Sequence, residues 1–302
     1  GIETPRDLYR AALSAAPSKP HSRHSETETY TLGEAMPAPH TAQTLIDVID
    51  WHVKTHPDRP HIHFYSDDGA GDVMTYRRLR EGATALACRL QQQGVQPGEP
   101  VAIMLPTGDE YFFAYMGILM AGGVPVPIYP PVRRSQIEDH LRRHSAILRN
   151  CGASIMIIIP EAKLFAQVLK SQAENLKYLF TVEELISKGG VCREPKLSTR
   201  DIAFLQYTSG STGNPKGVVL THANLLANIR AMGEAVRISS SDVIVSWLPL
   251  YHDMGLIGAW MSSLYYATLF VLMSPLAFIG HPQSWLQAIH RHRGTISAAP
   301  NF

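Results

Sequence analysis

The sequence has almost no net charge and few cysteines, and both shortages narrow its possible functions. Its 302 residues carry 27 Lys and Arg against 26 Asp and Glu, for a formal net charge of +1. No overall field can therefore recruit nucleic acid or an anionic membrane, and any anion site must be local. The cysteines, Cys88, Cys151 and Cys192, lie far apart without C-x-x-C or zinc-type spacing. We therefore expect reduced thiols, no thiol-based site and a cytoplasmic protein.

A long uninterrupted hydrophobic segment is also missing. Residues 111–128, YFFAYMGILMAGGVPVPI, carry no charge and approach the lower length limit of a membrane-spanning helix. Gly122, Gly123, Pro125 and Pro127 divide this stretch into a helix and a following strand, so we expect no membrane span. The N-terminus has no basic segment followed by an apolar one, as a secretory signal would have. Its first residue is not methionine, which suggests a processed or excised chain.

The composition changes near residue 42. The segment from residue 14 to about 42 is rich in Ser, Thr, Pro and His and poor in large aliphatic side chains. This composition is typical of a linker or surface arm, and we assign residues 1–41 to such an arm. Residues 42–302 are then globular, because the overall apolar content of 45% is enough for a core.

Helical and extended patterns alternate through the globular part. Strands of continuous aliphatic residues, separated by helices, are typical of parallel sheets covered on both faces. The sequence therefore predicts an α/β fold with mostly parallel sheets flanked by helices. We expect helices over residues 75–94, 109–123, 135–152, 162–172 and 222–236, and strands over 99–105, 124–130, 153–159, 176–182, 201–207, 217–221 and 242–250.

Residues 207–217, YTSGSTGNPKG, lie between two of these predicted strands. Glycines allow backbone N–H groups to converge on an anion, hydroxyl groups add donors, and a lysine adds positive charge. A polyphosphate is the ligand that such a loop would suit. The candidate phosphate-binding residues are Thr208, Ser209, Gly210, Ser211, Thr212, Gly213 and Lys216.

Two other kinds of loop must be compared with this one. A Walker loop has Gly before its Lys and Ser or Thr after it, whereas Lys216 follows Pro215 and precedes Gly217. The loop also leads into a strand, and the next helix begins only after Thr221, a suitable N-cap. A solvent-exposed hairpin turn has much the same composition. The residues alone leave a polyphosphate site and a plain turn both open.

The longer stretch YTSGSTGNPKGVVLTH, residues 207–222, resembles the phosphate-binding signature of the adenylate-forming superfamily. This superfamily includes acyl-CoA synthetases, luciferases, peptide-synthetase adenylation domains and fatty acyl-AMP ligases. Residues 74–131 resemble the early part of the same fold, and the resemblance covers roughly residues 42–302. It implies an incomplete adenylation domain, with the rest of that domain and a small C-terminal domain lying downstream.

A second motif, SWLPLYHDMGLIG at residues 246–258, follows a predicted strand. Residues at strand ends of α/β folds lie where ligands bind, although a His–Asp pair that merely stabilises a loop is an alternative. The motif resembles the segment that borders the acyl-carboxylate pocket of the superfamily. Together with PVPIYPP at residues 125–131, the sequence of this motif is most similar to that of fatty acyl-AMP ligases. The candidate substrate-binding residues are Tyr251, His252, Asp253, Met254 and Gly255, and His252 and Lys216 are the candidate catalytic residues.

The resemblance implies that a fatty-acid carboxylate attacks the α-phosphorus of ATP to give acyl-adenylate and pyrophosphate. Because both reactants are negatively charged, catalysis needs donors and a metal that offset repulsion and align them. The cofactors would be ATP and Mg²⁺, with the metal ligand downstream of this chain and none within it. Apolar residues such as Leu256, Ile257 and Trp260 either line an acyl tunnel or pack in the core.

The resemblance implies a fatty acid and an acyl carrier protein, which accepts the acyl group, as partners. It also implies a place in a larger multidomain synthase for polyketides or lipopeptides. Nucleic acid is not expected. An acyl-CoA synthetase of the same fold and a non-catalytic lipid- or nucleotide-binding derivative are the alternatives. Since the family places further functional residues downstream, this stretch of chain alone should not complete catalysis.

Overall fold

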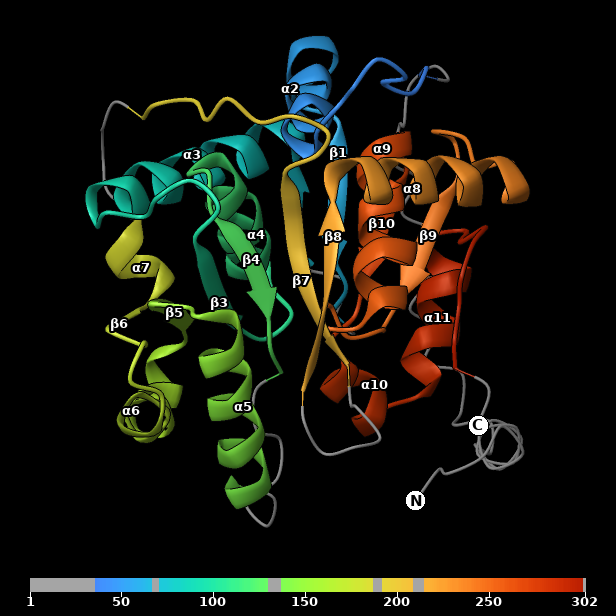
Figure 1. The fold of residues 1–302 in the computed structure, drawn as a ribbon. Helices are drawn as coiled ribbons and strands as arrows, with labels where there is room; N and C mark the ends of the chain where they lie inside the picture. Colours follow the sequence, from blue (N-terminus) through green and yellow to red (C-terminus); the bar gives the residue numbers. More distant parts are fainter. Residues whose placement is uncertain (1–35, 67–70, 130–136, 187–191, 209–214, 301–302) are drawn as a thin grey trace.

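The computed structural model describes residues 36–66, 71–129, 137–186, 192–208 and 215–300. These residues form two four-stranded sheets and one two-stranded hairpin. Figure 1 shows the hairpin between the two larger sheets, with helices packed around all three. The predicted α/β architecture with mostly parallel sheets is confirmed. The boundary between an arm and a domain at residue 42 stays a prediction. Part of the proposed arm contacts the globular part, because the backbone N–H of Met36 donates to the Ser240 hydroxyl.

The first large sheet has the strand order β2-β1-β10-β9. Its parallel strands β1 (Pro60–Phe64), β10 (Leu269–Leu272) and β9 (Val243–Ser246) come from opposite ends of the described chain. The short β2 (Val73–Thr75) pairs antiparallel with β1 and forms one edge. This sheet places the end of β9, and the residues that follow it, beside the hairpin.

The second large sheet has the order β4-β3-β5-β6, and all its strands are parallel. The aliphatic residues of β3 (Pro100–Met104) and β5 (Ile155–Ile158) are buried on both faces, as their continuous apolar sequences predict. At the two edges lie β4 (Val124–Pro127) and the more exposed β6 (Tyr178–Phe180). β4 lies against the hairpin, so the two sheets approach each other there.

The hairpin consists of β7 (Ile202–Thr208) and β8 (Lys216–Thr221), which pair antiparallel with Thr208 opposite Lys216. The prediction that the glycine-rich loop joins strand to strand is therefore confirmed. A capping box at Thr221 then starts helix α8 (His222–Val236), with the Thr221 hydroxyl accepting from the backbone N–H of Asn224. This order of elements excludes a Walker loop.

Most of the helices cover the outer faces of the sheets, but some are buried. Helix α4 (Asp109–Met120) is buried almost all round, and it stops just before Gly122, whose φ of 90° suits glycine. Among the described helices, none is long and apolar enough to cross a membrane. The other helices are α2 (Leu45–Thr55), α3 (Tyr76–Gln92), α5 (Ile137–Cys151), α6 (Lys163–Gln172), α7 (Val182–Leu185), α9 (Ser262–Tyr266), α10 (Pro275–Gly280) and α11 (Gln283–Arg291), with a 3₁₀ turn η2 (Pro160–Ala162) and a π-helix η3 (Met254–Met261).

Aromatic side chains fill the space between α4 and the first large sheet. Trp260 is fully buried, and its ring packs against those of Phe112 at 4.8 Å and Tyr115 at 5.2 Å. Trp260 and Leu256 both belong to the buried core cluster, and their role as tunnel residues stays a prediction. Because η3 is anchored by this cluster, its N-terminus is held in a fixed place.

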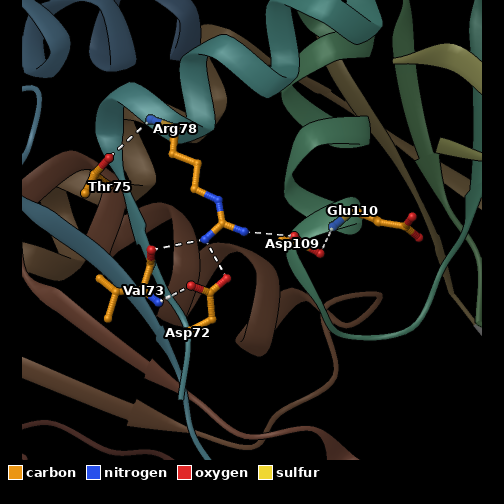
Figure 2. Close-up of polar contacts among 6 residues, drawn as sticks. All are labelled: Asp72, Val73, Thr75, Arg78, Asp109 and Glu110. Atoms are coloured by element: carbon orange, nitrogen blue, oxygen red, sulfur yellow. Dashed lines mark hydrogen bonds and ion pairs between the residues drawn. The ribbon is translucent and has the colours of Figure 1, made fainter. Parts of the chain in front are cut away.

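A surface arginine ties together the starts of two helices. Arg78 in the first turn of α3 donates to the Asp72 carboxylate at 2.5 Å, to the Val73 carbonyl and to the Asp109 carboxylate at 3.1 Å (Figure 2). Asp109 also accepts from the backbone N–H of Glu110 at the start of α4. These partly exposed ion pairs fix the relative position of β2, α3 and α4, although each contributes little free energy.

The expectation of three separate reduced thiols is wrong for two of the cysteines. Cys88 on α3 and Cys192 are joined in a disulfide, with their Cα atoms 4.7 Å apart. Their sequence separation of 104 residues hid this pairing, because only the fold brings α3 next to the segment that leads into β7. Cys151, at the end of α5, is a free thiol.

Candidate functional site

A cavity of about 350 Å³ lies at the carboxyl ends of β4 and β7. It has a size typical of small-molecule sites. Four of the residues singled out from the sequence, Thr208, Tyr251, His252 and Asp253, contribute to its lining. A second cavity of about 280 Å³, beside Arg80 and Cys192, contains none of the predicted site residues. The other residues that line the first cavity are Pro127, Ile128, Tyr129, Arg143, Ile147, Gln206 and Tyr207.

The hairpin presents Thr208 and Lys216 at the point where the glycine-rich loop leaves it. The two residues are opposite each other in the antiparallel register, and both are exposed. No carboxylate within the described ranges lies at ion-pair distance from Lys216, so its charge is available to an anion. Ser209, Gly210, Ser211, Thr212 and Gly213 lie outside the described residues, and their proposed role stays a prediction.

Two hydrogen bonds hold the segment after β9 in place. The side-chain amide of Gln206 on β7 donates to the Tyr251 carbonyl at 2.9 Å, and the Tyr111 hydroxyl on α4 donates to the Leu250 carbonyl at 2.8 Å. Both donors come from elements packed in the core, so they preset the backbone of this loop. The sequence pattern did not reveal Gln206 as part of the site.

His252 and Asp253 form a local pair at the mouth of the cavity. The Nδ1 atom of His252 lies 2.6 Å from Oδ1 of Asp253, and each side chain is 65% exposed. Asp253 also accepts from the backbone N–H of Met254 at 2.8 Å and thereby caps η3. The sequence-based alternative of a loop-stabilising His–Asp pair is thus present in the structure, and it leaves the His252 ring accessible at the cavity.

Gly255 has a packing reason to be glycine. A Cβ atom at this position would lie 2.3 Å from the Pro249 carbonyl oxygen, so only glycine lets η3 start so close to the preceding loop. Neither Gly255 nor Met254 lines the cavity in the part of the chain that the structure describes. Met254 is instead 41% exposed beside it. Met254 and Gly255 begin the eight-residue π-helix η3, and a π-helix is a rare conformation that often occurs at functional sites.

Tyrosines surround the inner part of the cavity. Tyr129 and Tyr251 have ring centroids 5.5 Å apart, and burial followed by the proximity of Tyr129 raises the pKa of Tyr251. Burial also raises the pKa of Tyr207 to about 12, with a smaller effect from Cys151. The Tyr207 hydroxyl donates to the Asn150 side chain at 2.5 Å. The Tyr251 phenol therefore stays protonated at neutral pH and can donate a hydrogen bond to a ligand, whereas the Tyr207 proton is already donated to Asn150.

Metal ligands are scarce in this region. In the ranges that the structure covers, no group of three or more His, Cys, Asp and Glu side chains could hold a metal ion. A Mg²⁺ ion that accompanies a nucleotide would therefore need other ligands, such as the phosphate oxygens and residues from elsewhere. By contrast, hydroxyl groups and Lys216 at the hairpin suit the phosphates of a nucleotide.

The fold and the cavity define a class of α/β proteins in which a hairpin between two larger sheets meets the segment after a strand at one cavity. The family model described as "AMP-binding enzyme" matches residues 49–301. The chain belongs to this family.

Two curated relatives are similar over most of this chain. The medium-chain-fatty-acid–[acyl-carrier-protein] ligase JamA of Moorena producens is 34% identical over 86% of this chain and 44% of its own length. The long-chain-fatty-acid–AMP ligase FadD32 of Mycolicibacterium smegmatis is 37% identical over 78% of this chain and 38% of its own length. The chain thus spans less than half the length of these relatives.

Solved structures agree with the fold. The fatty acid AMP ligase from Legionella pneumophila has a TM-score of 0.78 and 33% identity, over 86% of this chain and 45% of that one. A fatty acyl-adenylate ligase from the same organism, in complex with acyl adenylate and pyrophosphate, has a TM-score of 0.77 and 32% identity. The overlap covers 86% of this chain and 45% of the Legionella chain.

Proposed function

We propose that the protein is a fatty acyl-AMP ligase, which activates a fatty acid with ATP to give acyl-adenylate and pyrophosphate. The observation that carries this proposal is the meeting of Thr208, Tyr251 and His252 at one cavity at the carboxyl ends of strands. The relatives with fatty-acid ligase names support the same chemistry.

The proposed site residues form two groups, one for the phosphates of ATP and one for the fatty-acid carboxylate. Lys216, the Thr208 hydroxyl and the loop residues 209–213 would hold phosphate groups by charge and hydrogen bonds. His252, at the cavity mouth, would border the fatty-acid carboxylate together with Tyr251 and Asp253. When bound, Mg²⁺ supplies positive charge that offsets the repulsion between carboxylate and triphosphate. The protein's part is to align the two anions and to keep donors directed at them.

The acceptor of the acyl group would be an acyl carrier protein, as the name of the JamA relative states for that protein. A carrier protein would fit a place in a larger polyketide or lipopeptide synthase. We also propose a cytoplasmic location, where ATP is available. The Cys88–Cys192 bond is unusual for such a location, because disulfides are rare in the cytosol.

An acceptor competition tests this proposal against a coenzyme A ligase of the same fold. The full-length protein is given ATP, Mg²⁺, a fatty acid, coenzyme A and an acyl carrier protein together, and both thioesters are quantified. We expect acyl-adenylate and acyl carrier protein thioester. A predominance of acyl-CoA would favour the synthetase alternative, and the absence of adenylate would favour a non-catalytic binding protein.

A further inference from the structure

Arg143 on α5 lines the cavity and carries a positive charge. The roles proposed above do not use this residue. It lies in the same lining as Thr208, Gln206 and His252. Its guanidinium lies over the Tyr129 ring, 5.5 Å from the centroid. A ring face stabilises a cation there without neutralising it. Arg143 thus brings a positive charge to the cavity from an element other than the hairpin that carries Lys216.

The hydrogen-bonding capacity of Arg143 is incompletely used within the protein. Its Nε atom is buried and has no hydrogen-bond partner. Among the ranges that the structure describes, no carboxylate lies within ion-pair distance of this side chain. Asp253 supplies the acidic group in the described lining of the cavity, and its carboxylate pairs with His252 at 2.6 Å. The charge of Arg143 is therefore not compensated within the described part of the protein, so an anion in the cavity would pair with it.

The neighbouring histidines do not add to this positive charge. Burial, then the proximity of His140 and of Arg143 itself, lowers the pKa of His144 to about 3. Burial and then Arg143 also lower the pKa of His140, against a smaller opposite effect of Asp139. Both rings are therefore neutral at physiological pH. The charge available to a ligand on this side of the cavity is that of Arg143.

Arg142, the adjacent residue, provides a contrast on the same helix. Its side chain is 84% exposed and pairs with Asp139 at 3.0 Å. Arg142 therefore faces solvent with its charge compensated, whereas Arg143 faces the cavity without an acidic partner. Two adjacent arginines thus differ in their surroundings while sharing size, charge and helix.

We infer that Arg143 binds a phosphate oxygen of the nucleotide or of the pyrophosphate product in this cavity, as a second cation beside Lys216. The planar guanidinium suits two parallel hydrogen bonds to a phosphate. Thr208, which lies in the same cavity, is the residue that leads into the hydroxyl-rich loop, so phosphate is favoured over the fatty-acid carboxylate. This assignment deepens the proposed adenylation and rests on it.

Calorimetric titration of the full-length protein tests the assignment without relying on turnover. Pyrophosphate, ATP and a medium-chain fatty acid are titrated separately into the wild type, Arg143→Gln, Arg143→Lys and the matched control Arg142→Gln. We expect Arg143→Gln to raise the Kd for pyrophosphate and ATP at least tenfold and the Kd for the fatty acid less than twofold. Arg143→Lys should recover part of the phosphate affinity, and Arg142→Gln should bind like the wild type. Thermal melting verifies that each variant is folded.

Several results would overturn the assignment. Equal pyrophosphate affinity of wild type and Arg143→Gln would remove Arg143 from the site, and a wild type that binds no pyrophosphate would do the same. A loss confined to the fatty acid would assign the residue to the carboxylate instead. If the wild type binds ATP but forms no adenylate, the proposed function fails; if it forms adenylate and Arg143→Gln binds normally, only the present inference fails.

Discussion

The side-chain amide of Gln206 donates a hydrogen bond to the backbone carbonyl of Tyr251, with a donor–acceptor distance of 2.9 Å. This contact joins β7, which leads into the glycine-rich loop that we propose binds phosphate, to the segment that carries His252. The two motifs recognised in the sequence are therefore physically connected. A shift of either one would be transmitted to the other through this bond.

Gln206→Leu should lower both stability and nucleotide affinity. The substitution leaves the Tyr251 carbonyl without its donor, which we expect to cost about 1 kcal/mol in the free energy of unfolding. Gln91→Leu is the control, because the Gln91 amide also donates to a backbone carbonyl, that of Arg193, at 2.8 Å. Urea denaturation should show a loss for both variants, whereas ATP affinity should fall only for Gln206→Leu. Unchanged ATP affinity in that variant would mean that the connection is structural alone.

Gly255→Ala should be poorly tolerated. Its new methyl group would lie 2.3 Å from the Pro249 carbonyl oxygen, a backbone atom that cannot move without displacing the loop before His252. We expect a loss of about 1–3 kcal/mol in the free energy of unfolding. Gly258→Ala, within the same helix, is the control, since its nearest neighbour would be the Met254 Cγ atom at 3.9 Å. Equal stability of the two variants would show that the close approach at Gly255 is not rigid.

Acid should destabilise the protein through His52, which is buried beside His56, Arg59 and Tyr76. Burial, and then the proximity of His56, lower the pKa of the folded-state ring to about 3, while an unfolded histidine has a pKa of about 6.5. The unfolded state therefore binds a proton that the folded state does not, and stability is lost as the pH falls from 6.5 toward 3. At pH 5 this loss is about 2 kcal/mol for His52.

Unfolding free energies measured between pH 5 and 6 check this expectation. His52→Phe keeps a ring to stack on Tyr76, which lies 4.4 Å from the His52 ring centroid. The variant should reduce the slope of stability against pH by about 1.2 kcal/mol per pH unit over this range. The exposed His281→Gln variant should keep the wild-type slope. An unaltered slope in His52→Phe would mean that His52 takes up its proton while the protein is still folded.

The Cys88–Cys192 pair predicts that, of Cys88, Cys151 and Cys192, one is a free thiol in protein that is purified without reductant. Cys151 is that thiol, and a thiol-specific reagent under denaturing conditions, followed by peptide mapping, should label one of the three before reduction and all three after it. Closing a loop of this length stabilises by roughly 4–5 kcal/mol in the loop-entropy treatment, so Cys88→Ser should lower stability substantially under oxidising conditions. Cys151→Ser should leave the pairing intact. Three thiols before reduction would contradict the bond.

The sequence predicted much of this architecture because the decisive signals were local. The predicted helix over residues 222–236 coincides with α8, since Thr221 caps its start and apolar residues recur at helical spacing. The strand-to-strand setting of the glycine-rich loop was likewise predictable. The pairing of β1 with β10 and the Cys88–Cys192 bond were not, because each joins segments far apart in the chain. Local patterns carry no information on such partners.

The candidate site was predicted only in part, because local motifs can be read from the sequence and long-range contacts cannot. Tyr251, His252 and Asp253 form a recognisable motif after a strand, and the structure brings them to the cavity with Thr208. Arg143 lies in an ordinary amphipathic helix, where the sequence does not distinguish it from Arg142. Gln206 looks like any polar residue of a strand. Only the packing of α5 and β7 around one cavity gives these two residues their significance.

We propose that the hairpin and its cavity form the phosphate-binding half of a fatty-acid adenylation site. Fatty-acid-dependent exchange between ATP and labelled pyrophosphate tests it most directly. The full-length wild type is compared with Lys216→Ala and with the control Lys177→Ala, which removes an exposed lysine that does not line the cavity. We predict acid-dependent exchange that falls at least tenfold in Lys216→Ala alone, while its unfolding free energy changes by less than about 0.5 kcal/mol. An unchanged exchange rate in Lys216→Ala, or no acid-dependent exchange in the wild type, would contradict the account.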